Sequence, residues 1–313
     1  MSPRSMSKSA DASAVAVTAN AVDVADITIA LPGREPVQAR TYGLKQRGVT
    51  SPLVLHFHGG TFTCGGLDSG RMVAGLLQDA GAVVVSLAYP LAPKYPFPEP
   101  IEVAYAVLEW LYGQRVKLAG KGAPVFLAGE EAGGNLAAAV ALIARDRGHP
   151  PLAGQILLSP MLDPCAGTAS LRETTGDATQ CKWAAGWQQF LSSPKDAVHP
   201  YAVPSASMRL GQIAPTLVLV GDDDPMRDEA LTFARRLREA GNPVTSSVLP
   251  SATNWPDALS DPAAGECVCG ATVKKHFREF FDAAAPPVKA PSATATSAMP
   301  VTKPAKPQAS KTG

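Results

Sequence analysis

Residues 123–144 read APVFLAGEEAGGNLAAAVALIA, and this stretch decides the fold. The apolar run from Val125 to Ala128 has the composition of a buried strand, and a helical pattern begins at Leu136. Glycines stand two residues before and two residues after Glu131. Glycines in these positions allow a sharp strand-to-helix turn that presents the side chain at its centre. The stretch therefore predicts a strained elbow with a carboxylate at its tip instead of a hydroxyl.

Strand and helix patterns alternate on both sides of this turn, between residues 22 and 284. Eight short β-branched or apolar runs occur, at 25–31, 36–42, 52–58, 82–89, 123–129, 154–160, 215–221 and 244–250. Helical periods lie between them, as where Ile101, Tyr105 and Leu108 share one stripe. Such alternation is typical of crossover units. It predicts an α/β domain with about eight mostly parallel strands, flanked by helices.

Composition divides the chain into three parts. With 46% hydrophobic and 18% charged residues, the 313 residues hold enough apolar material for one large domain, predicted over 21–284. The low-complexity residues 1–20 and the Pro/Ala/Lys-rich tail 285–313 are predicted to be disordered. Residues from about 165 to 201 follow a strand end and break the alternation, which predicts a cap-like insertion over the carboxyl edge of the sheet. α/β folds bind ligands at that edge.

Charge, hydropathy and cysteine spacing exclude several classes of protein. The net charge of +1 offers no field that would attract nucleic acid or an anionic membrane. No stretch reaches the roughly eighteen apolar residues of a spanning helix, and the N-terminus lacks a signal-peptide core. The five cysteines are scattered, so we expect reduced thiols and a cytoplasmic location. We expect no nucleic-acid partner, no membrane span, no metal and no other cofactor.

Two more segments with chemical potential follow predicted strands. A glycine loop that could build an oxyanion hole consists of His58, Gly59, Gly60 and Thr61. Asp224 follows the strand in LVLVGDDDPMRDEA (217–230), where an acid is well placed to orient a catalytic base. Thirty residues later, LPSATNWPDAL (249–259) contains Asn254 and no histidine.

In this order, the motifs resemble those of the hormone-sensitive-lipase-like carboxylesterases of the α/β-hydrolase superfamily. The family's His-Gly-Gly-Gly loop appears at 58–61, its Gly-Asp-Ser-Ala-Gly-Gly-Asn elbow at 129–135 and its Asp-Pro-Leu-Arg-Asp-Glu segment at 224–229. The segments 87–100, 157–163 and 199–204 resemble further family stretches. The resemblance covers roughly residues 22–284. It implies an α/β-hydrolase fold with a reduced cap, and it also implies a homodimer.

The departures from the family pattern lie at the catalytic positions. Carried over position by position, the nucleophilic serine is Glu131 and the catalytic histidine is Asn254, while the catalytic acid is retained as Asp224. Serine hydrolysis needs a hydroxyl nucleophile and a base that takes its proton, so the implied triad is incomplete. The oxyanion-hole or pocket residues that the resemblance implies are His58, Gly59, Gly60, Thr61 and Ala132.

The position of Glu131 at a helix N-terminus predicts where its carboxylate lies. An anion at a helix N-terminus is favoured by about 0.3–2 kcal/mol, so we expect Glu131 to occupy the oxyanion hole and to block the acyl position. We therefore expect a non-hydrolytic protein that binds a small apolar or acyl ligand, or that regulates. Two alternatives stay open. Glu131 and Asp224 could act as an acid–base pair in a lyase-type reaction, or residual ester hydrolysis could survive. No ligand spacing supports a metal held by Glu131, Asp224 and His58.

Overall fold

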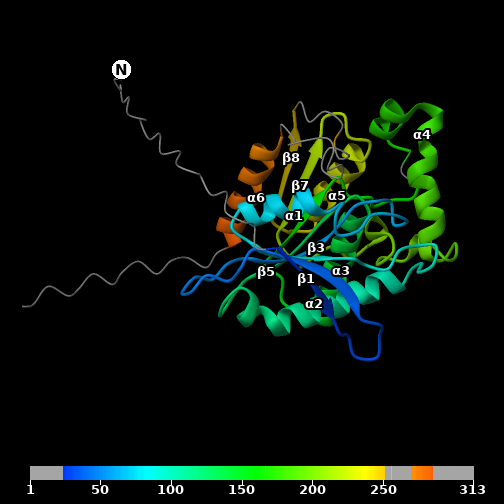
Figure 1. Cartoon of the computed structure of the whole chain (residues 1–313). Helices are drawn as coiled ribbons and strands as arrows, with labels where there is room; N and C mark the ends of the chain where they lie inside the picture. The colour runs from blue at the N-terminus through cyan, green and yellow to red at the C-terminus, as the bar shows by residue number, and fades with distance from the viewer. Residues whose placement is uncertain (1–23, 166, 251–254, 256–268, 285–313) are drawn as a thin grey trace, which may run out of the picture.

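One sheet of eight strands forms the centre of the computed structural model, which describes residues 24–165, 167–250, 255 and 269–284 (Figure 1). The strand order is β1-β2-β4-β3-β5-β6-β7-β8. The strands are β1 (Val24–Ile29), β2 (Val37–Tyr42), β3 (Leu53–Phe57), β4 (Val83–Leu87), β5 (Val125–Glu130), β6 (Gly154–Leu158), β7 (Thr216–Gly221) and β8 (Val244–Leu249). All eight coincide with the apolar runs of the sequence, so the predicted sheet is confirmed.

Strand direction places the candidate residues at one edge of this sheet. β2 is antiparallel to β1 and β4, and the other neighbours are parallel. β3, β5 and β6 are buried along their whole length, which explains why their sequences are mostly apolar. Because parallel strands end on the same side, the segments that follow β3, β5, β6 and β7 meet at one carboxyl edge.

Helices cover both faces of the sheet (Figure 1). α2 (Glu99–Leu118), α3 (Ala132–Arg147) and α5 (Arg227–Glu239) share one apolar cluster with Leu55 of β3. α1 (Arg71–Asp79) and α6 (Gly270–Ala284) share a second cluster with Val54. Neighbouring strand residues point to opposite faces, so the two clusters are the two sides of the sheet. This confirms the predicted layer of helices on each side.

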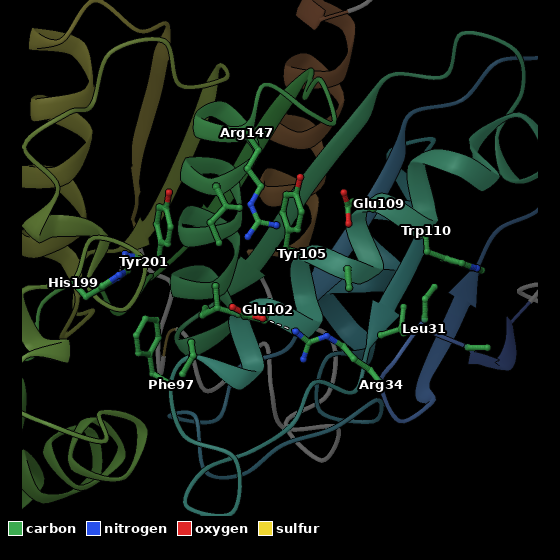
Figure 2. A pocket seen from close by; sticks show the side chains of 16 residues that line it. Leu31, Arg34, Phe97, Glu102, Tyr105, Glu109, Trp110, Arg147, His199 and Tyr201 are labelled. Atoms are coloured by element: carbon green, nitrogen blue, oxygen red, sulfur yellow. Dashed lines mark hydrogen bonds and ion pairs between the residues drawn. The ribbon is translucent and has the colours of Figure 1, made fainter.

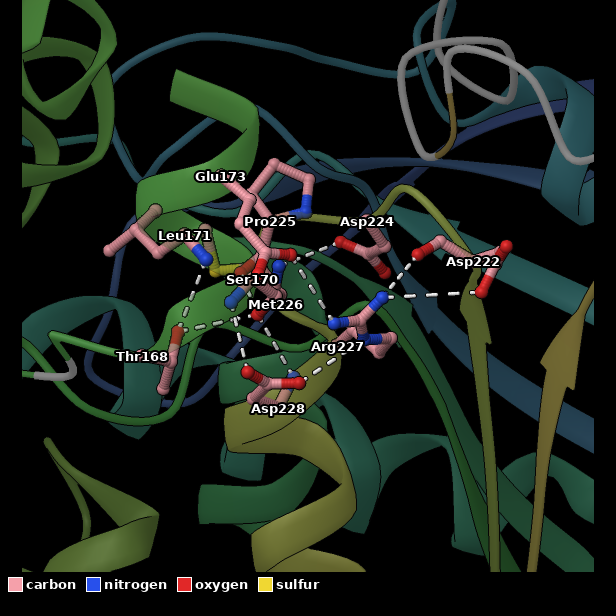
Figure 3. A network of polar contacts seen from close by, with 10 residues as sticks. All are labelled: Thr168, Ser170, Leu171, Glu173, Asp222, Asp224, Pro225, Met226, Arg227 and Asp228. Carbon is pink, nitrogen blue, oxygen red and sulfur yellow. Dashed lines mark hydrogen bonds and ion pairs between the residues drawn. The ribbon is translucent and has the colours of Figure 1, made fainter. Parts of the chain in front are cut away.

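α4 (Ala169–Phe190) stands apart from these two layers, at the end of the molecule drawn at the right of Figure 1. It lies within the segment predicted to be cap-like and is followed by two short 3₁₀ helices, η1 (Asp196–Val198) and η2 (Pro204–Ala206). The Thr168 hydroxyl caps its first turn by accepting from the Leu171 N–H at 3.3 Å. The Ser170 N–H donates to Asp228 Oδ2 at 2.9 Å, and the Ser170 hydroxyl donates to the Pro225 carbonyl at 3.0 Å (Figure 3). The start of α4 is therefore fastened to the turn that precedes α5.

Three remaining predictions concern the chain ends, a membrane span and the cysteines. The terminal segments 1–20 and 285–313 lie outside the described residues. Among the described helices, none combines the length and the apolar character needed to cross a bilayer. Cys269 is disulfide-bonded, so the prediction of reduced thiols is wrong for this residue. Pairing depends on where folding brings two Cβ atoms, and scattered spacing in the sequence does not reveal that.

Candidate functional site

The turn between β5 and α3 has the geometry of a nucleophile elbow. Glu131 is the single residue between the two elements, with φ 48° and ψ −115°, a conformation that L-residues rarely adopt. A Cβ atom added at Gly133 would lie 2.0 Å from the Phe57 carbonyl oxygen. One added at Gly129 would lie 2.2 Å from the Gly133 oxygen. The two glycines therefore let the first turn of α3 pack directly against the backbone of β3 and β5.

The Glu131 side chain points onto the glycine loop that follows β3. It is only 3% exposed, and its Oε2 accepts a hydrogen bond from the Gly60 N–H at 2.9 Å. Lys182 of α4 places its Nζ 4.0 Å from Glu131 Oε1. The carboxylate thus lies on a backbone donor of the loop, with a cation from the cap at the other oxygen.

His58 and Tyr89 hold the start of the glycine loop. The two rings stack with centroids 4.3 Å apart, and the Tyr89 hydroxyl donates to the His58 carbonyl at 2.9 Å. His58 Nδ1 lies 2.6 Å from the Gly59 oxygen, and burial lowers the pKa of this imidazole. Thr61 has φ 53° and shares a hydrogen bond of 3.2 Å with the Thr63 hydroxyl. His58 therefore shapes the loop as a neutral ring.

A buried hydrogen bond between His56 and Glu130 supports the same loop from below. His56 Nε2 lies 2.8 Å from Glu130 Oε2, and neither side chain is exposed. His56 Nδ1 lies 2.9 Å from the Ser86 hydroxyl, and the Gly59 N–H donates to Glu130 Oε1 at 3.2 Å. These bonds join β3, β4 and β5 beneath the elbow. The sequence analysis missed this pair, although Glu130 stands directly beside Glu131.

Asp224 has acquired partners other than an imidazole. The Ser159 hydroxyl donates to its Oδ2, and the Met226 N–H donates to its Oδ1 at 2.8 Å. Trp255, the residue directly after Asn254 in the sequence, donates its indole N–H to the Ser159 hydroxyl oxygen. Asn254 itself lies outside the described residues. The fold thus brings Ser159 to Asp224. This serine is fully buried, and no histidine among the described residues is hydrogen-bonded to it or to Asp224.

Burial dominates the protonation of Asp224. The pKa of this carboxyl is raised to about 7, because burial and, to a smaller extent, the charge of Glu131 outweigh the lowering effect of the hydrogen bonds from Ser159 and Met226. Asp224 and Glu131 are therefore close enough to influence one another. Among the described residues, no group of three His, Cys, Asp or Glu side chains is arranged to hold a metal ion.

α4 rests directly on the glycine loop. A Cβ atom added at Gly186 would lie 2.3 Å from the Thr61 carbonyl oxygen. The Phe62 ring stacks on Phe190 with centroids 4.0 Å apart and contacts Trp187 at 4.8 Å. Between α4 and the start of α5 lies a cavity of about 210 Å³. Its lining includes Leu171, Trp183, Ala184, Trp187, Met226 and Glu229.

The sequence contains a signal for the position of Ser159 but none for the contact that Trp255 makes with it. Ser159 ends a buried strand at the carboxyl edge, which is the same signal that indicated Asp224. Nothing in the sequence indicates that an indole would reach it from a segment 96 residues away. Lys182 lies in the predicted cap, where no periodic pattern indicated which side chains face the elbow.

The raised pKa of Asp224 predicts a pH dependence of stability. A folded-state pKa of about 7, against 3.8 for the free carboxyl, means that the folded state retains this proton. The stabilisation is present below pH 3.8 and is lost as the pH rises through about 7. Relative to the wild type, Asp224→Asn should gain up to about 4 kcal/mol in the free energy of unfolding between pH 4 and pH 8. Urea unfolding at each pH measures this, with the exposed Asp222→Asn as control. A constant difference across the range contradicts it.

Comparison with known proteins agrees with this geometry. A family described as having the alpha/beta hydrolase fold matches residues 54–253. Carboxylic ester hydrolase LipN of Mycobacterium tuberculosis is 36% identical over 245 residues, which are 74% of this chain and 64% of LipN. Carboxylesterase NlhH of the same species is 30% identical, over 76% of this chain and 77% of NlhH. This chain therefore spans slightly less than two thirds of LipN.

A solved structure shows the same fold. The hyperthermophilic esterase from the archaeon Pyrobaculum calidifontis superposes with a TM-score of 0.71 and 32% identity. The superposition covers 84% of this chain and 86% of the esterase. With the eight-stranded sheet, the elbow and the glycine loop in place, the α/β-hydrolase fold is established. The chain belongs to the hormone-sensitive-lipase-like carboxylesterase family.

Proposed function

We propose that this chain is a non-hydrolytic member of its family, which binds a small apolar or acyl ligand in the cavity between α4 and the start of α5, or which regulates. The hydrogen bond from the Gly60 N–H to Glu131 Oε2, at 2.9 Å, carries the proposal. Acyl transfer needs free donors where the oxyanion develops. In this chain a side chain of the protein already occupies one such donor, so a substrate carbonyl has to compete with a resident anion.

The partners of Asp224 support the same proposal. In a working triad the acid orients an imidazole that accepts the proton of the nucleophile. Here the two Asp224 oxygens accept from Ser159 and Met226, and Trp255 completes the chain of hydrogen bonds. All of these groups are buried. The acid is thus engaged in a buried chain of hydrogen bonds that holds the fold together.

The cavity between α4 and the start of α5 indicates the class of ligand. Its walls are mainly apolar, with Trp183 and Trp187 from α4 and Met226 from the turn after Asp224. At about 210 Å³ it is smaller than the pockets that hold drug-sized ligands, which measure about 300–1,000 Å³. It therefore suits a short acyl or alkyl group.

A cytoplasmic location and a homodimer stay predictions from the sequence.

One observation favours a second candidate, an acid–base pair of Glu131 and Asp224. Asp224 has a pKa of about 7, to which the charge of Glu131 contributes, and paired carboxyls of separated pKa can exchange protons in eliminations. Neither carboxyl lines the cavity, however, and both are buried. The arrangement of the two carboxyls therefore favours a structural role over proton transfer to a ligand.

The proposal is tested with one ester used both as ligand and as substrate. Ethyl butyrate should raise the melting temperature of the wild type, because a ligand selective for the folded state stabilises it. It should be consumed no faster than in a heat-denatured sample. Ala184→Leu, which fills the cavity, should abolish the shift in melting temperature. Consumption above the denatured control contradicts the loss of hydrolysis, most sharply if Glu131→Ala removes it. The absence of a shift at saturating ester contradicts ligand binding.

A further inference from the structure

A second and larger cavity lies away from the elbow. It measures about 810 Å³ and is bordered by the loop between β1 and β2, the first half of α2, the end of α3 and the segment after α4 (Figure 2). None of the residues that surround Glu131 or Asp224 lines it. Its volume falls within the range of about 300–1,000 Å³ that is typical of pockets for small ligands.

The walls of this cavity are aromatic and aliphatic. Phe97, Tyr105, Trp110 and Tyr201 line it from three segments of the chain, and Ile101 and Ile143 contribute further apolar surface. Aromatic side chains present large, rigid apolar surfaces, which makes them effective in ligand contacts. The cavity is therefore built to receive an apolar body.

Two of the four charged side chains in the cavity wall neutralise one another. Arg34 donates to Glu102 at 2.5 Å and to Glu99, which lies just outside the cavity, at 3.0 Å. The Arg34 guanidinium is thus fully engaged, and its two carboxylate partners leave one net negative charge at this side of the cavity. This part of the wall thus holds the loop between β1 and β2 against the start of α2.

The other two charges, Arg147 and Glu109, are not neutralised in this way. Within residues 24–165, 167–250, 255 and 269–284, neither takes part in an ion pair. The Arg147 guanidinium lies over the Tyr105 ring, 4.3 Å from its centroid. Figure 2 shows this ring between Arg147 and Glu109. The Tyr105 hydroxyl is held by the His149 carbonyl at 2.7 Å, so the ring is a fixed spacer between two opposite charges.

We propose that this cavity binds a small zwitterion with an apolar body, of the dipeptide class, whose carboxylate pairs with Arg147 and whose ammonium pairs with Glu109. A ligand with a single charge would meet one opposite and one like charge, whereas one charge of each sign matches both. Because a ring separates the two protein charges, the ligand charges must also be separated. A dipeptide, whose ends stand apart across a peptide unit, meets this requirement better than a free amino acid does.

The test uses leucyl-phenylalanine, its N-acetyl form and its C-terminal amide, titrated calorimetrically into the full chain. The dipeptide should bind, and each capped form should bind at least about tenfold more weakly, because each loses one charge-assisted contact. Free phenylalanine should also bind more weakly than the dipeptide. No binding of the dipeptide at millimolar concentration, or equal binding of all three peptides, overturns the proposal.

Two exposed variants assign each contact separately. Arg147→Gln should weaken the dipeptide and the N-acetyl form by about tenfold and leave the amide unchanged, while Glu109→Gln should spare only the N-acetyl form. Arg235→Gln, on an exposed face of α5, is the matched control and should leave all three affinities unchanged. An equal loss for all ligands in either variant contradicts the two-point contact. Since this cavity shares no residue with the elbow site, the result is independent of the proposed function.

Discussion

Replacing Glu131 by serine and Asn254 by histidine together should turn this chain into an ester hydrolase. The elbow already holds its central residue at φ 48° and ψ −115°, and removal of the carboxylate frees the Gly60 N–H for an oxyanion. Asp224 would have to orient the new imidazole in exchange for the Ser159 hydroxyl. We expect hydrolysis of p-nitrophenyl acetate to rise at least about 10²-fold over the wild type, since a positioned general base contributes about 10²–10⁴-fold.

The single substitutions are the controls for this rescue. Glu131→Ser supplies a nucleophile without a base, and Asn254→His supplies a base without a nucleophile, so each alone should stay near the wild-type rate. A double variant no faster than Glu131→Ser contradicts the prediction. That outcome would mean that Ser159 and Trp255 hold Asp224 too firmly for it to accept an imidazole. Adding Trp255→Ala to the double variant would test this directly.

Gly133→Ala should be among the most damaging single substitutions in the chain. The added Cβ would lie 2.0 Å from the Phe57 oxygen and 2.5 Å from the His58 oxygen, both of which belong to the backbone of β3 and its exit. No side-chain rotation relieves this contact, so α3 must move away from the sheet. We expect a loss of about 4 kcal/mol or more in the free energy of unfolding, at the upper end of the range for single substitutions.

Gly113→Ala is the matched control. Gly113 lies in the exposed part of α2, where a Cβ atom meets nothing within 4 Å. Alanine favours the helix there by about 0.5–1 kcal/mol. Urea unfolding of both variants measures the difference in their free energies of unfolding. If Gly133→Ala does not fold, the yields of folded protein from the two variants are compared instead. A Gly133→Ala protein within about 1 kcal/mol of the wild type contradicts the close packing of α3 on β3.

The sheet was predictable because its strands carry strong local signals. β3, β5 and β6 are buried on both faces, so they are short and mostly apolar runs, and their length favours a strand over a buried helix. The elbow was also predictable, because Gly129 and Gly133 permit a backbone path that other residues cannot follow. In both cases a short stretch of sequence contains the whole physical cause.

The partners of Asp224 were not predictable in this way. Ser159 lies 65 residues and Trp255 lies 31 residues from Asp224 along the chain, and only the folded sheet brings the three together. The contact between Lys182 and Glu131 likewise depends on how α4 is placed, which its sequence does not specify. The pairing of a cysteine such as Cys269, the placement of α4 and a chain of hydrogen bonds all depend on distances in space, and local sequence patterns carry little information about them.

The tight seat of α3 against β3 bears on how such sequences evolve. Gly129 and Gly133 are required by backbone contacts that exist whether or not a reactive group stands between them. Mutational drift can therefore remove the nucleophile at little cost, while the demand for a foldable chain retains the surrounding glycines. The glycine pattern alone is therefore no evidence of catalytic activity, because the close packing of the backbone requires these glycines whether or not a nucleophile stands between them.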